Sequence, residues 1–597
     1  MNHLTFWARG WVASFLIFTV VPACAQDRVR LSEEEGQWTM PAKDYANTRY
    51  SRLKEITTEN VKHLRPVWTF STGVLAGHEG QPLMVQDTLY VVTPFPNVLY
   101  AFDLREEGYP LKWKYRPFVN PQSVGIACCD TVNRGAAYAG GKVIYNLLDG
   151  YTVAVDAATG KEVWKTQVAD IRIGETTTMA PLVVKNKVLV GNAGGELGVR
   201  GWIKALDIQT GKLLWTGYST GPDKDVLIDT AFYRPHLPQE KGANLGAKSW
   251  PNDAAWKIGG GTVWGWLSYD PELDLVYYGT GNPAPYNAKQ RPGDNKWTNS
   301  MLARDPDDGR VRWAYQQTPH DNWDFDATQE HILVDLPFRG KLRKTLVHFD
   351  KNGFAYNVDR TNGELLMAKP YVHVNWAKRV DLKTGRPQVN PEKETGAGKV
   401  AKDICPNLEG GKNQQPAAYS PRTRLFYVPT SNLCMDFKSV ATGYLAGTPY
   451  IGAAMPYKAW PGAGGNLGAY IAWDAVEGKK VWEVKEKYPA WSGALVTGGD
   501  VLFYGTLDGW FKAVDARSGE VLWKFKVGSG VIGNPITYLG PDGKQYVAIY
   551  AGFGGDWLLL SGDTRSDDPA DVRPPADFMP DIAKHTSRGG MIWLFAL

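Results

Sequence analysis

A short phrase recurs along the chain, and it constrains the fold more than any other feature of the sequence. Each full copy has an Asp, a Gly four residues later and a Trp eight residues later. Five segments keep all three residues: 155–164, 206–215, 304–313, 473–482 and 514–523. The segment 358–367 has Met in place of Trp, and looser copies occur at 102–113 and 269–279. The phrase is typical of a β-hairpin in which one strand ends at Asp, a Gly-containing turn follows, and the next strand ends in Trp.

The spacing of the copies predicts how many such units the chain contains. Asp103, Asp156 and Asp207 are 53 and 51 residues apart, and Asp305 and Asp359 are 54 apart. A period of about 50 residues predicts about eight units, each long enough for a four-stranded sheet. We therefore expect an all-β fold, a single eight-bladed β-propeller, with the repeated Trp residues largely buried at equivalent places between blades. The C-terminal segment 589–597 is expected to be a last strand that completes the first blade and closes the ring.

Composition agrees with this fold and narrows the possible partners. The 597 residues include 64 Gly, 24 Trp and 29 Tyr, a turn-rich and aromatic-rich mixture that favours strands over a helical bundle. Lys and Arg total 66 against 62 Asp and Glu, and no long basic run occurs, so no nucleic-acid partner is expected. The Gly-, Pro- and Asn-rich stretches 217–260, 283–300 and 370–470 are predicted to be long functional loops on one face.

The first 25 residues are predicted to be a signal peptide. Arg9 precedes an apolar run from Trp11 to Val21, and Ala23, Cys24 and Ala25 provide small residues for cleavage after Ala25. A lipid anchor on Cys24 is the alternative. No later stretch reaches ~18 apolar residues, so residues 26–597 are expected to form one domain that does not span a membrane and works in the periplasm.

Four cysteines remain after this segment. An even number in an oxidising compartment favours disulfides. Cys405 and Cys434 are 29 residues apart and would close a loop worth ~3–4 kcal/mol in the chain-entropy model. The adjacent Cys128 and Cys129 form either a strained ring or two buried free thiols, and spacing alone leaves both possibilities open. The chain has no Cys-x-x-Cys-His, so it carries no c-type haem signature of its own.

Three segments hold candidate ligands for a hard cation. In WDFD (323–326), Asp324 and Asp326 are two residues apart and would point the same way if the segment is extended. Glu196 lies in GGELGVRG and Asn282 in GTGNPAP, both among glycines. Each segment alone is also compatible with an ordinary solvated turn.

Taken together, these segments resemble the quinoprotein alcohol dehydrogenases of the methanol/ethanol dehydrogenase type, whose cofactor is pyrroloquinoline quinone (PQQ). The resemblance extends over nearly the whole chain, through DYANTRYSRL (44–53), ACCDTVNRG (127–135) and YGTLDGWFKAVD (504–515). It implies an eight-bladed propeller that oxidises small primary alcohols to aldehydes by hydride transfer to metal-bound PQQ. It further implies a separate soluble cytochrome c as electron acceptor, and a possible homodimer.

The resemblance also assigns cofactor contacts. Cys128 and Cys129 would be bonded to each other against one face of the quinone, and Trp264 would cover the other face. The remaining implied contacts are Arg134, Thr178, Ala193, Gly194, Gly195, Thr262, Lys351, Asn413 and Trp491. Two positions depart from the family pattern. Ala193-Gly194-Gly195-Glu196 replaces Ser-Gly-Ala-Glu and loses one hydroxyl donor. Lys351 replaces an Arg found in many members, which keeps the charge but not the bidentate fork.

The implied metal ligands are Glu196, Asn282 and Asp324. Asp324 would also be the general base that takes the alcohol proton, while Lys351 and the metal would polarise the quinone carbonyl. Calcium-using members resembling this chain have a small residue two positions after the base, whereas lanthanide-using members have Asp. Because a third carboxylate suits a trivalent ion, Asp326 predicts a lanthanide(III) ion, with Ca²⁺ as the alternative.

Two other functions remain open at this point. One is a calcium-dependent quinoprotein dehydrogenase for larger alcohols or sugars. The other is a non-catalytic propeller scaffold, which would leave Cys128, Cys129, Trp264 and the WDFD segment without a role.

Overall fold

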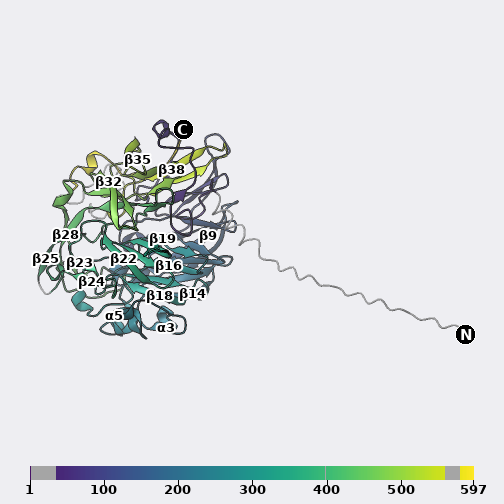
Figure 1. The fold of residues 1–597 in the computed structure, drawn as a ribbon. Helices are drawn as coiled ribbons and strands as arrows, with labels where there is room; N and C mark the ends of the chain where they lie inside the picture. Colours follow the sequence, from purple (N-terminus) through teal and green to yellow (C-terminus); the bar gives the residue numbers. More distant parts are fainter. Residues whose placement is uncertain (2–34, 397–398, 558–578) are drawn as a thin grey trace.

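The structure is a computed structural model that describes residues 35–396, 399–557 and 579–597, together with Met1. The predicted signal peptide beyond Met1, and with it Cys24, lies outside these residues. Within the described ranges the chain is almost entirely β-structure, and its helices are single turns (Figure 1). No helix in these ranges is long and apolar enough to cross a membrane.

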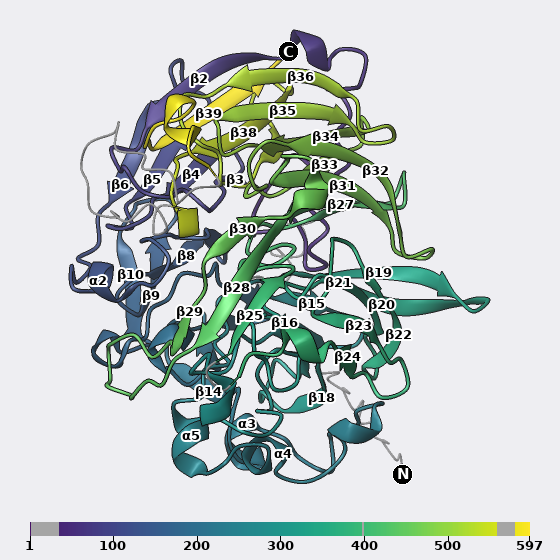
Figure 2. The same cartoon turned by 90° about the vertical axis from the view of Figure 1, so that its left-hand side faces the viewer.

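Eight sheets follow one plan and are arranged around a ring (Figure 2). The first three consist of β3 (Leu83–Val85), β4 (Thr88–Val92), β5 (Leu99–Asp103) and β6 (Leu111–Tyr115); β7 (Ala136–Ala139), β8 (Lys142–Leu147), β9 (Tyr151–Asp156) and β10 (Glu162–Gln167); and β11 (Leu182–Val184), β12 (Lys187–Gly191), β13 (Trp202–Asp207) and β14 (Leu213–Tyr218). The fourth and fifth consist of β15 (Ser268–Asp270), β16 (Leu275–Gly279), β17 (Ser300–Arg304) and β18 (Val311–Gln316); and β19 (His331–Phe338), β20 (Lys341–Phe349), β21 (Phe354–Asp359) and β22 (Glu364–Pro370).

The last three sheets include strands from both ends of the chain. The sixth has β26 (Ala418–Ser420), β27 (Leu425–Ser431), β31 (Gly468–Asp474) and β32 (Lys479–Glu486). The seventh has β33 (Leu495–Thr497), β34 (Val501–Gly505), β35 (Trp510–Asp515) and β36 (Val521–Lys526), with β1 (Tyr50–Ser51) parallel to β33. The eighth has β37 (Ile536–Leu539), β38 (Gln545–Ala551), β39 (Met591–Ala596) and β2 (Arg65–Ser71).

The first strand of each blade lies nearest the axis of the ring. First strands of neighbouring blades contact each other, as β3 does β7, β7 does β11 and β26 does β33. Inner strands such as β12 are completely buried, whereas the residues of outer strands such as β36 are half-buried or exposed. The predicted all-β propeller is therefore confirmed, with its apolar core between the sheets.

The ring closes in the last blade rather than in the first. The C-terminal strand β39 pairs with β38 on one side and with the N-terminal strand β2 on the other. We expected this strand to complete the first blade. Instead, the N-terminal strand crosses to the last blade, so one sheet holds both ends of the described chain together.

The repeated phrase forms the contact between neighbouring blades. Its Asp ends the third strand, and the carboxylate accepts hydrogen bonds from the turn, as Asp207 does from the backbone N–H groups of Gln209 and Thr210 (3.0 and 2.9 Å). The Trp of the preceding blade packs on the turn glycine. A β-carbon on Gly211, for example, would lie 2.6 Å from the ring of Trp164.

The same Trp also donates a hydrogen bond across the interface. Its indole N–H reaches the backbone carbonyl that follows the next blade's repeated Asp, as Trp164 reaches Ile208 (3.0 Å) and Trp313 reaches Arg360 (3.0 Å). Gly and Trp are thus required together, because the flat ring approaches the backbone directly and still satisfies its polar N–H.

Three details of the repeat differ from the prediction. The Trp residues lie within the fourth strand rather than at its end, directly after a β-bulge. Trp164 and Trp313 are buried, but Trp215, Trp482 and Trp523 are only half-buried because the outer strands face solvent. The segment 269–279 is not a copy, since it forms the hairpin between β15 and β16 instead of the outer hairpin.

The stretch 370–470 is more ordered than the predicted loop. It contains β26 and β27 of the sixth blade, the pair β23 (Ala377–Val380) and β24 (Pro387–Val389), and an extra sheet. This insert sheet consists of β25 (Val400–Ile404), β28 (Leu433–Ser439), β29 (Ala453–Ala454) and β30 (Tyr457–Ala459). The stretch 217–260 instead forms the short helices α3 (Asp223–Val226), α4 (Leu245–Lys248) and α5 (Asp253–Lys257).

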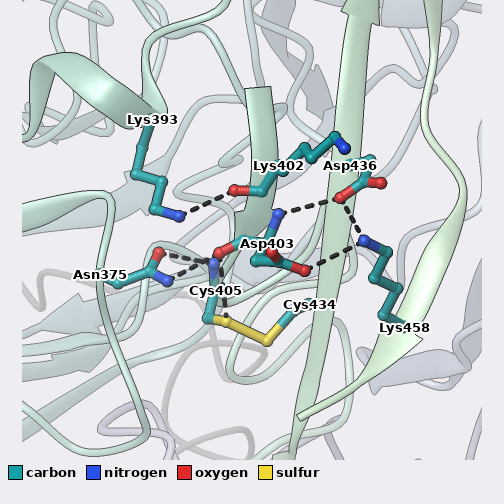
Figure 3. Close-up of a disulfide and its surroundings, with 8 residues drawn as sticks. All are labelled: Asn375, Lys393, Lys402, Asp403, Cys405, Cys434, Asp436 and Lys458. Atoms are coloured by element: carbon teal, nitrogen blue, oxygen red, sulfur yellow. Dashed lines mark hydrogen bonds and ion pairs between the residues drawn. A yellow bond between two sulfur atoms is a disulfide. The ribbon is translucent and has the colours of Figure 1, made fainter. Parts of the chain in front are cut away.

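A disulfide fastens the insert sheet. Cys405 follows β25 and is bonded to Cys434 on β28 (Figure 3). Beside it, the Lys458 ammonium binds the carboxylates of Asp403 (3.0 Å) and Asp436 (2.6 Å), which links β30 to both strands. The chain that leaves Cys405 is thereby fastened to the strands β28 and β30.

Removing one interblade Trp is expected to destabilise the propeller strongly. Trp313 is fully buried, so we expect Trp313→Ala to lower the free energy of unfolding by about 3–5 kcal/mol. Trp482→Ala provides the matched control, because Trp482 has the same role but is only half-buried. Denaturant unfolding of both variants checks this, and equal losses for the two would contradict the assigned packing.

Candidate functional site

The predicted site residues occupy equivalent positions in successive blades. In an antiparallel sheet, the segment that enters the first strand and the segment that leaves the second emerge at the same end. Residues just before a first strand are Arg134, Thr178, Trp264, Asp324, Asp326, Asn413 and Trp491, and those just after a second strand are Ala193, Gly194, Gly195, Glu196, Asn282 and Lys351. Residues hundreds of positions apart are therefore gathered at one end of the ring.

A cavity of about 260 Å³ lies where these segments meet. The predicted residues on its wall are Cys128, Cys129, Arg134, Thr178, Ala193, Gly194, Glu196, Trp264, Asp324, Asp326, Lys351 and Asn413. Gly195, Thr262, Asn282 and Trp491 are not on the wall. A β-carbon on Gly195 would lie 3.3 Å from both the Thr262 hydroxyl and the Asn282 amide oxygen, so these three residues are close neighbours. Trp491 is fully buried against Trp557, with ring centroids 4.8 Å apart.

One part of the wall is organised around Arg134. Its guanidinium forms an ion pair with Glu79 (2.9 Å), donates to the Thr178 hydroxyl (2.7 Å) and lies over the Trp264 ring, 5.1 Å from its centroid. All of these partners except Trp264 are buried. This part of the cavity combines a fixed positive charge with a large aromatic surface, which suits a flat ligand that carries carboxylates.

The vicinal cysteines form a disulfide on the same wall. Asp130 follows directly and anchors the segment, because its carboxylate accepts from the backbone N–H groups of Gly77 (2.7 Å) and Gly555 (3.0 Å). The anchor joins three chain segments that are remote in sequence. The rigid sulfur pair is thus held in place by a buried hydrogen-bonded carboxylate.

The other part of the wall is acidic and contains one cation. The Lys351 ammonium lies 2.7 Å from the Asp326 carboxylate and 3.2 Å from that of Asp324, and all three side chains are buried. Lys351 comes from the turn after β20, whereas the two Asp residues come from the segment before β19. Two carboxylates and one ammonium therefore lie together at the buried end of the cavity.

The two carboxylates converge for a different reason from the one predicted. The segment is not extended, because Asp324 has φ 68°, in the left-handed region. The turn is built on Asp321, whose carboxylate accepts from the backbone N–H groups of Trp323 (2.9 Å) and Phe325 (3.0 Å). Strain at a non-glycine residue that is held by such bonds is characteristic of functional sites.

The acidic part has the donor set of a cation site. The amide oxygen of Asn282 and one carboxylate oxygen of Asp324 are buried and have no hydrogen-bond partner among the residues that the structure describes. Asp326 accepts from the Asn282 backbone N–H (2.7 Å), which ties these two residues together. Buried oxygens without a donor are costly, and a hard cation bound to them would relieve that cost. The residues present therefore fit a metal ion.

Electrostatics place Glu196 in the same cluster. Burial raises the pKa of the Asp324 carboxyl well above its usual range, and the charges of Asp326 and Glu196 raise it further against the opposing effect of Lys351. Burial also raises the pKa of Glu196, with Asp326 as the largest added charge effect. In the described residues no three His, Cys, Asp or Glu side chains form a metal cluster by themselves.

Several residues of the site were not predicted from the sequence. Those on the cavity wall are Ala127, Asp130, Val132, Thr176, Tyr286, Leu408, Glu409, Ile451, Met455, Tyr457 and Asp556. The segments 408–409 and 451–457 provide five of them, and Glu409 is held by the Tyr457 hydroxyl (2.6 Å) and the Asn413 amide (2.9 Å). Glu409 lies four residues before the predicted site residue Asn413, and this proximity could have identified it as a candidate. The apolar wall residues Leu408, Ile451 and Met455 lie in the stretch that was predicted to be a loop, and no sequence pattern marks them.

Comparisons with known proteins agree with this geometry. Residues 38–375 and 459–547 match the PQQ family described as the β-propeller domain of glucose/ethanol/alcohol dehydrogenases. The chain is 53% identical to the lanthanide-dependent methanol dehydrogenase of Methylacidiphilum fumariolicum over 98% of this chain and 96% of that protein. It is 44% identical to methanol dehydrogenase [cytochrome c] subunit 1 of Methylorubrum extorquens over 96% of this chain and 93% of that protein. A solved europium-containing methanol dehydrogenase superimposes with a TM-score of 0.92, covering 96% of this chain and all of that one.

Proposed function

The chain belongs to the family of PQQ-dependent glucose/ethanol/alcohol dehydrogenases, and from this we propose that it is a lanthanide-dependent dehydrogenase of small primary alcohols. It oxidises the alcohol to the aldehyde and passes the electrons to an external cytochrome c. The observation that carries this proposal is the single cavity that joins the disulfide, Trp264 and Arg134 to the acidic cluster around Lys351.

The two parts of the cavity have separate roles in this proposal. Arg134 and Thr178 bind and orient PQQ, and the disulfide and Trp264 restrict it to one plane. Glu196, Asn282, Asp324 and Asp326 hold the metal ion. When bound, PQQ and the metal together supply a two-electron acceptor and a Lewis acid.

The protein's own residues prepare the substrate. Asp324 takes the hydroxyl proton of the alcohol, since one of its carboxylate oxygens is buried and accepts no hydrogen bond from the described part of the chain. Lys351 keeps a positive charge beside it. The apolar residues Leu408, Ile451 and Met455 line the same cavity and exclude water from the substrate.

We extend the proposal to location and assembly. The apolar N-terminal segment supports export to the periplasm, where disulfides persist. Assembly as a homodimer follows from the resemblance alone, and sedimentation velocity tests it.

A substrate panel on the purified protein tests the proposed function. We expect an absorbance spectrum with bound quinone, and reduction of a phenazinium dye that depends on methanol or ethanol and not on glucose. Absence of a bound quinone, or oxidation of sugars alone, would contradict the proposal. Reconstitution with added PQQ controls for incomplete loading during expression.

Replacing both vicinal cysteines is expected to affect the cofactor more than the fold. Cys128 and Cys129 lie on the cavity wall, not between blades. The double variant Cys128→Ser, Cys129→Ser should therefore keep the wild-type melting temperature to within a few degrees and lose PQQ affinity or electron transfer to the dye. PQQ titration followed by absorbance checks this. Unchanged affinity together with an unchanged rate would exclude a cofactor role for the disulfide.

A further inference from the structure

An apolar patch with a basic surround lies on the surface beside the cavity. It consists of Phe118, Ile173, Tyr444 and Leu445, and we call it the acceptor patch. Phe118 is 78% exposed and Leu445 is 66% exposed, while Ile173 and Tyr444 are about two-fifths exposed, at 43% and 40%. Large side chains with this exposure, gathered in one place, are typical of interaction sites.

The four residues belong to one continuous surface. Phe118 and Arg172 line the same surface groove, of about 490 Å³, and Ile173 follows Arg172 directly. The loop that carries Tyr444 and Leu445 abuts this segment, because a β-carbon on Gly447 would lie 2.9 Å from the carbonyl oxygen of Arg172. Figure 2 shows α2 (Ser123–Ile126), which follows Phe118, on the same side of the molecule as the loop between β28 and β29.

Each segment of the patch continues into the cavity wall. The groove residues Gln122 and Arg172 precede the wall residues Ala127 and Thr176 by five and four positions. At most ~3.6 Å per residue, these steps span no more than about 18 and 14 Å. The third segment reaches the metal end of the cavity, since the backbone N–H of Tyr450 donates to the Glu196 carbonyl (2.7 Å). A redox partner seated on the patch would thus be close to the quinone site.

The charges around the patch are mainly positive. Three alternate residues of the segment 114–119 are exposed: Lys114, Arg116 and Phe118. Pro117 and Val119 are buried, so the two cations and the phenyl ring lie on the same, solvent-facing side. The Lys165 ammonium binds the Phe118 carbonyl (2.8 Å). Two acids line the groove: Asp170 is paired with Arg172 (2.7 Å), and Asp149 accepts from the backbone N–H of Asn120 (2.8 Å). The patch therefore complements an apolar surface with an acidic rim.

We propose that the external electron acceptor, a c-type cytochrome with acidic residues around its exposed haem edge, docks on the acceptor patch. This inference rests on the proposed function. Each alcohol oxidised to aldehyde releases two electrons and two protons. Two ferric haems take one electron each and become ferrous, and the protons pass to solvent. The apolar centre brings the haem edge close to the cavity, and the basic surround selects and orients the partner.

Two acceptors and two variants test the proposal. Alcohol-dependent reduction is measured with a phenazinium dye and with an acidic class I cytochrome c, and binding of that cytochrome is measured by surface plasmon resonance. We expect Phe118→Ser combined with Leu445→Ser to raise KM for the cytochrome and its Kd by about tenfold or more, with the dye rate unchanged. Leu342→Ser is the matched control, because Leu342 is 72% exposed on the distant β19–β20 hairpin.

Further measurements test the role of the basic surround and distinguish failure of the docking site from failure of the proposed function. Wild-type KM for the acidic cytochrome should rise with salt, and a basic mitochondrial cytochrome c should be a poorer acceptor. Unchanged cytochrome KM and Kd in the double variant would overturn the docking surface. A change of oligomeric state in that variant would instead identify the patch as an interface between copies and also overturn it. Loss of dye reduction in the wild type would overturn the proposed function rather than the docking site.

Discussion

Asp324→Asn is expected to abolish alcohol oxidation with any metal, lowering kcat by about a thousandfold or more. The amide cannot take the hydroxyl proton, and it removes one anionic metal ligand. Asn is the appropriate replacement because it tolerates the left-handed conformation that Asp324 adopts at φ 68°. It can also still accept a hydrogen bond from Lys351. Dye-linked rates with saturating methanol and PQQ measure the effect.

The PQQ and metal content of the variant shows whether activity is lost because the base is missing or because the site no longer binds PQQ and metal. If the variant binds PQQ and metal normally and is inactive, Asp324 acts as the base. A variant that keeps more than about a tenth of the wild-type kcat would exclude Asp324 from that role, because a positioned base contributes at least ~100-fold.

Asp326→Ala is expected to lower lanthanide-supported activity by at least about 100-fold, and to leave or improve any calcium-supported activity. The change removes one of the three carboxylates proposed to hold the metal ion, and a trivalent ion needs this third charge whereas a divalent ion does not. It also removes the nearer carboxylate partner of Lys351, whose ammonium lies 2.7 Å from Asp326 and 3.2 Å from Asp324. Activity titrations with La³⁺ and with Ca²⁺ on metal-free protein measure both effects.

A second substitution separates the effect of the negative charge of Asp326 from the effect of its hydrogen bond to Asn282. Asp326 also accepts from the Asn282 backbone N–H at 2.7 Å, and Asp326→Asn keeps this acceptor while removing the charge. If charge decides the metal, both variants lose lanthanide activity alike. If Asp326→Asn retains the wild-type rate with La³⁺, the residue acts only by holding Asn282, and it does not select a trivalent ion.

The outer hairpins of the fold could be predicted from the sequence because each requires particular residues. The turn needs the Asp carboxylate, and the close ring contact needs Gly opposite Trp, so the phrase is visible wherever an outer hairpin precedes another blade. The last blade lacks the phrase because its outer strand is β2, from the other end of the chain. The insert sheet could not be predicted, since its strands pair only with one another across long connections.

Site residues could be predicted from the sequence where a family pattern marks them. Residues that only hold the site in place within the fold were not predicted. Resemblance directed attention to Arg134, Trp264 and Lys351, which the structure brings to one cavity. It did not point to Asp321 or Asp130, whose carboxylates act by holding turns through backbone N–H groups. Such anchoring leaves no distinctive spacing in the sequence, because any short polar residue before a turn has the same appearance.

The metal requirement of the purified protein tests the central claim most directly. Chelator-treated protein is supplied with PQQ and methanol, and dye reduction is followed while either La³⁺ or Ca²⁺ is added. The arrangement of Glu196, Asn282, Asp324 and Asp326 predicts that La³⁺ restores activity and that the same concentration of Ca²⁺ restores less than about a tenth of it, a difference of 1.4 kcal/mol or more. An equal or higher rate with Ca²⁺, or no methanol-dependent reduction with either ion, would contradict the account.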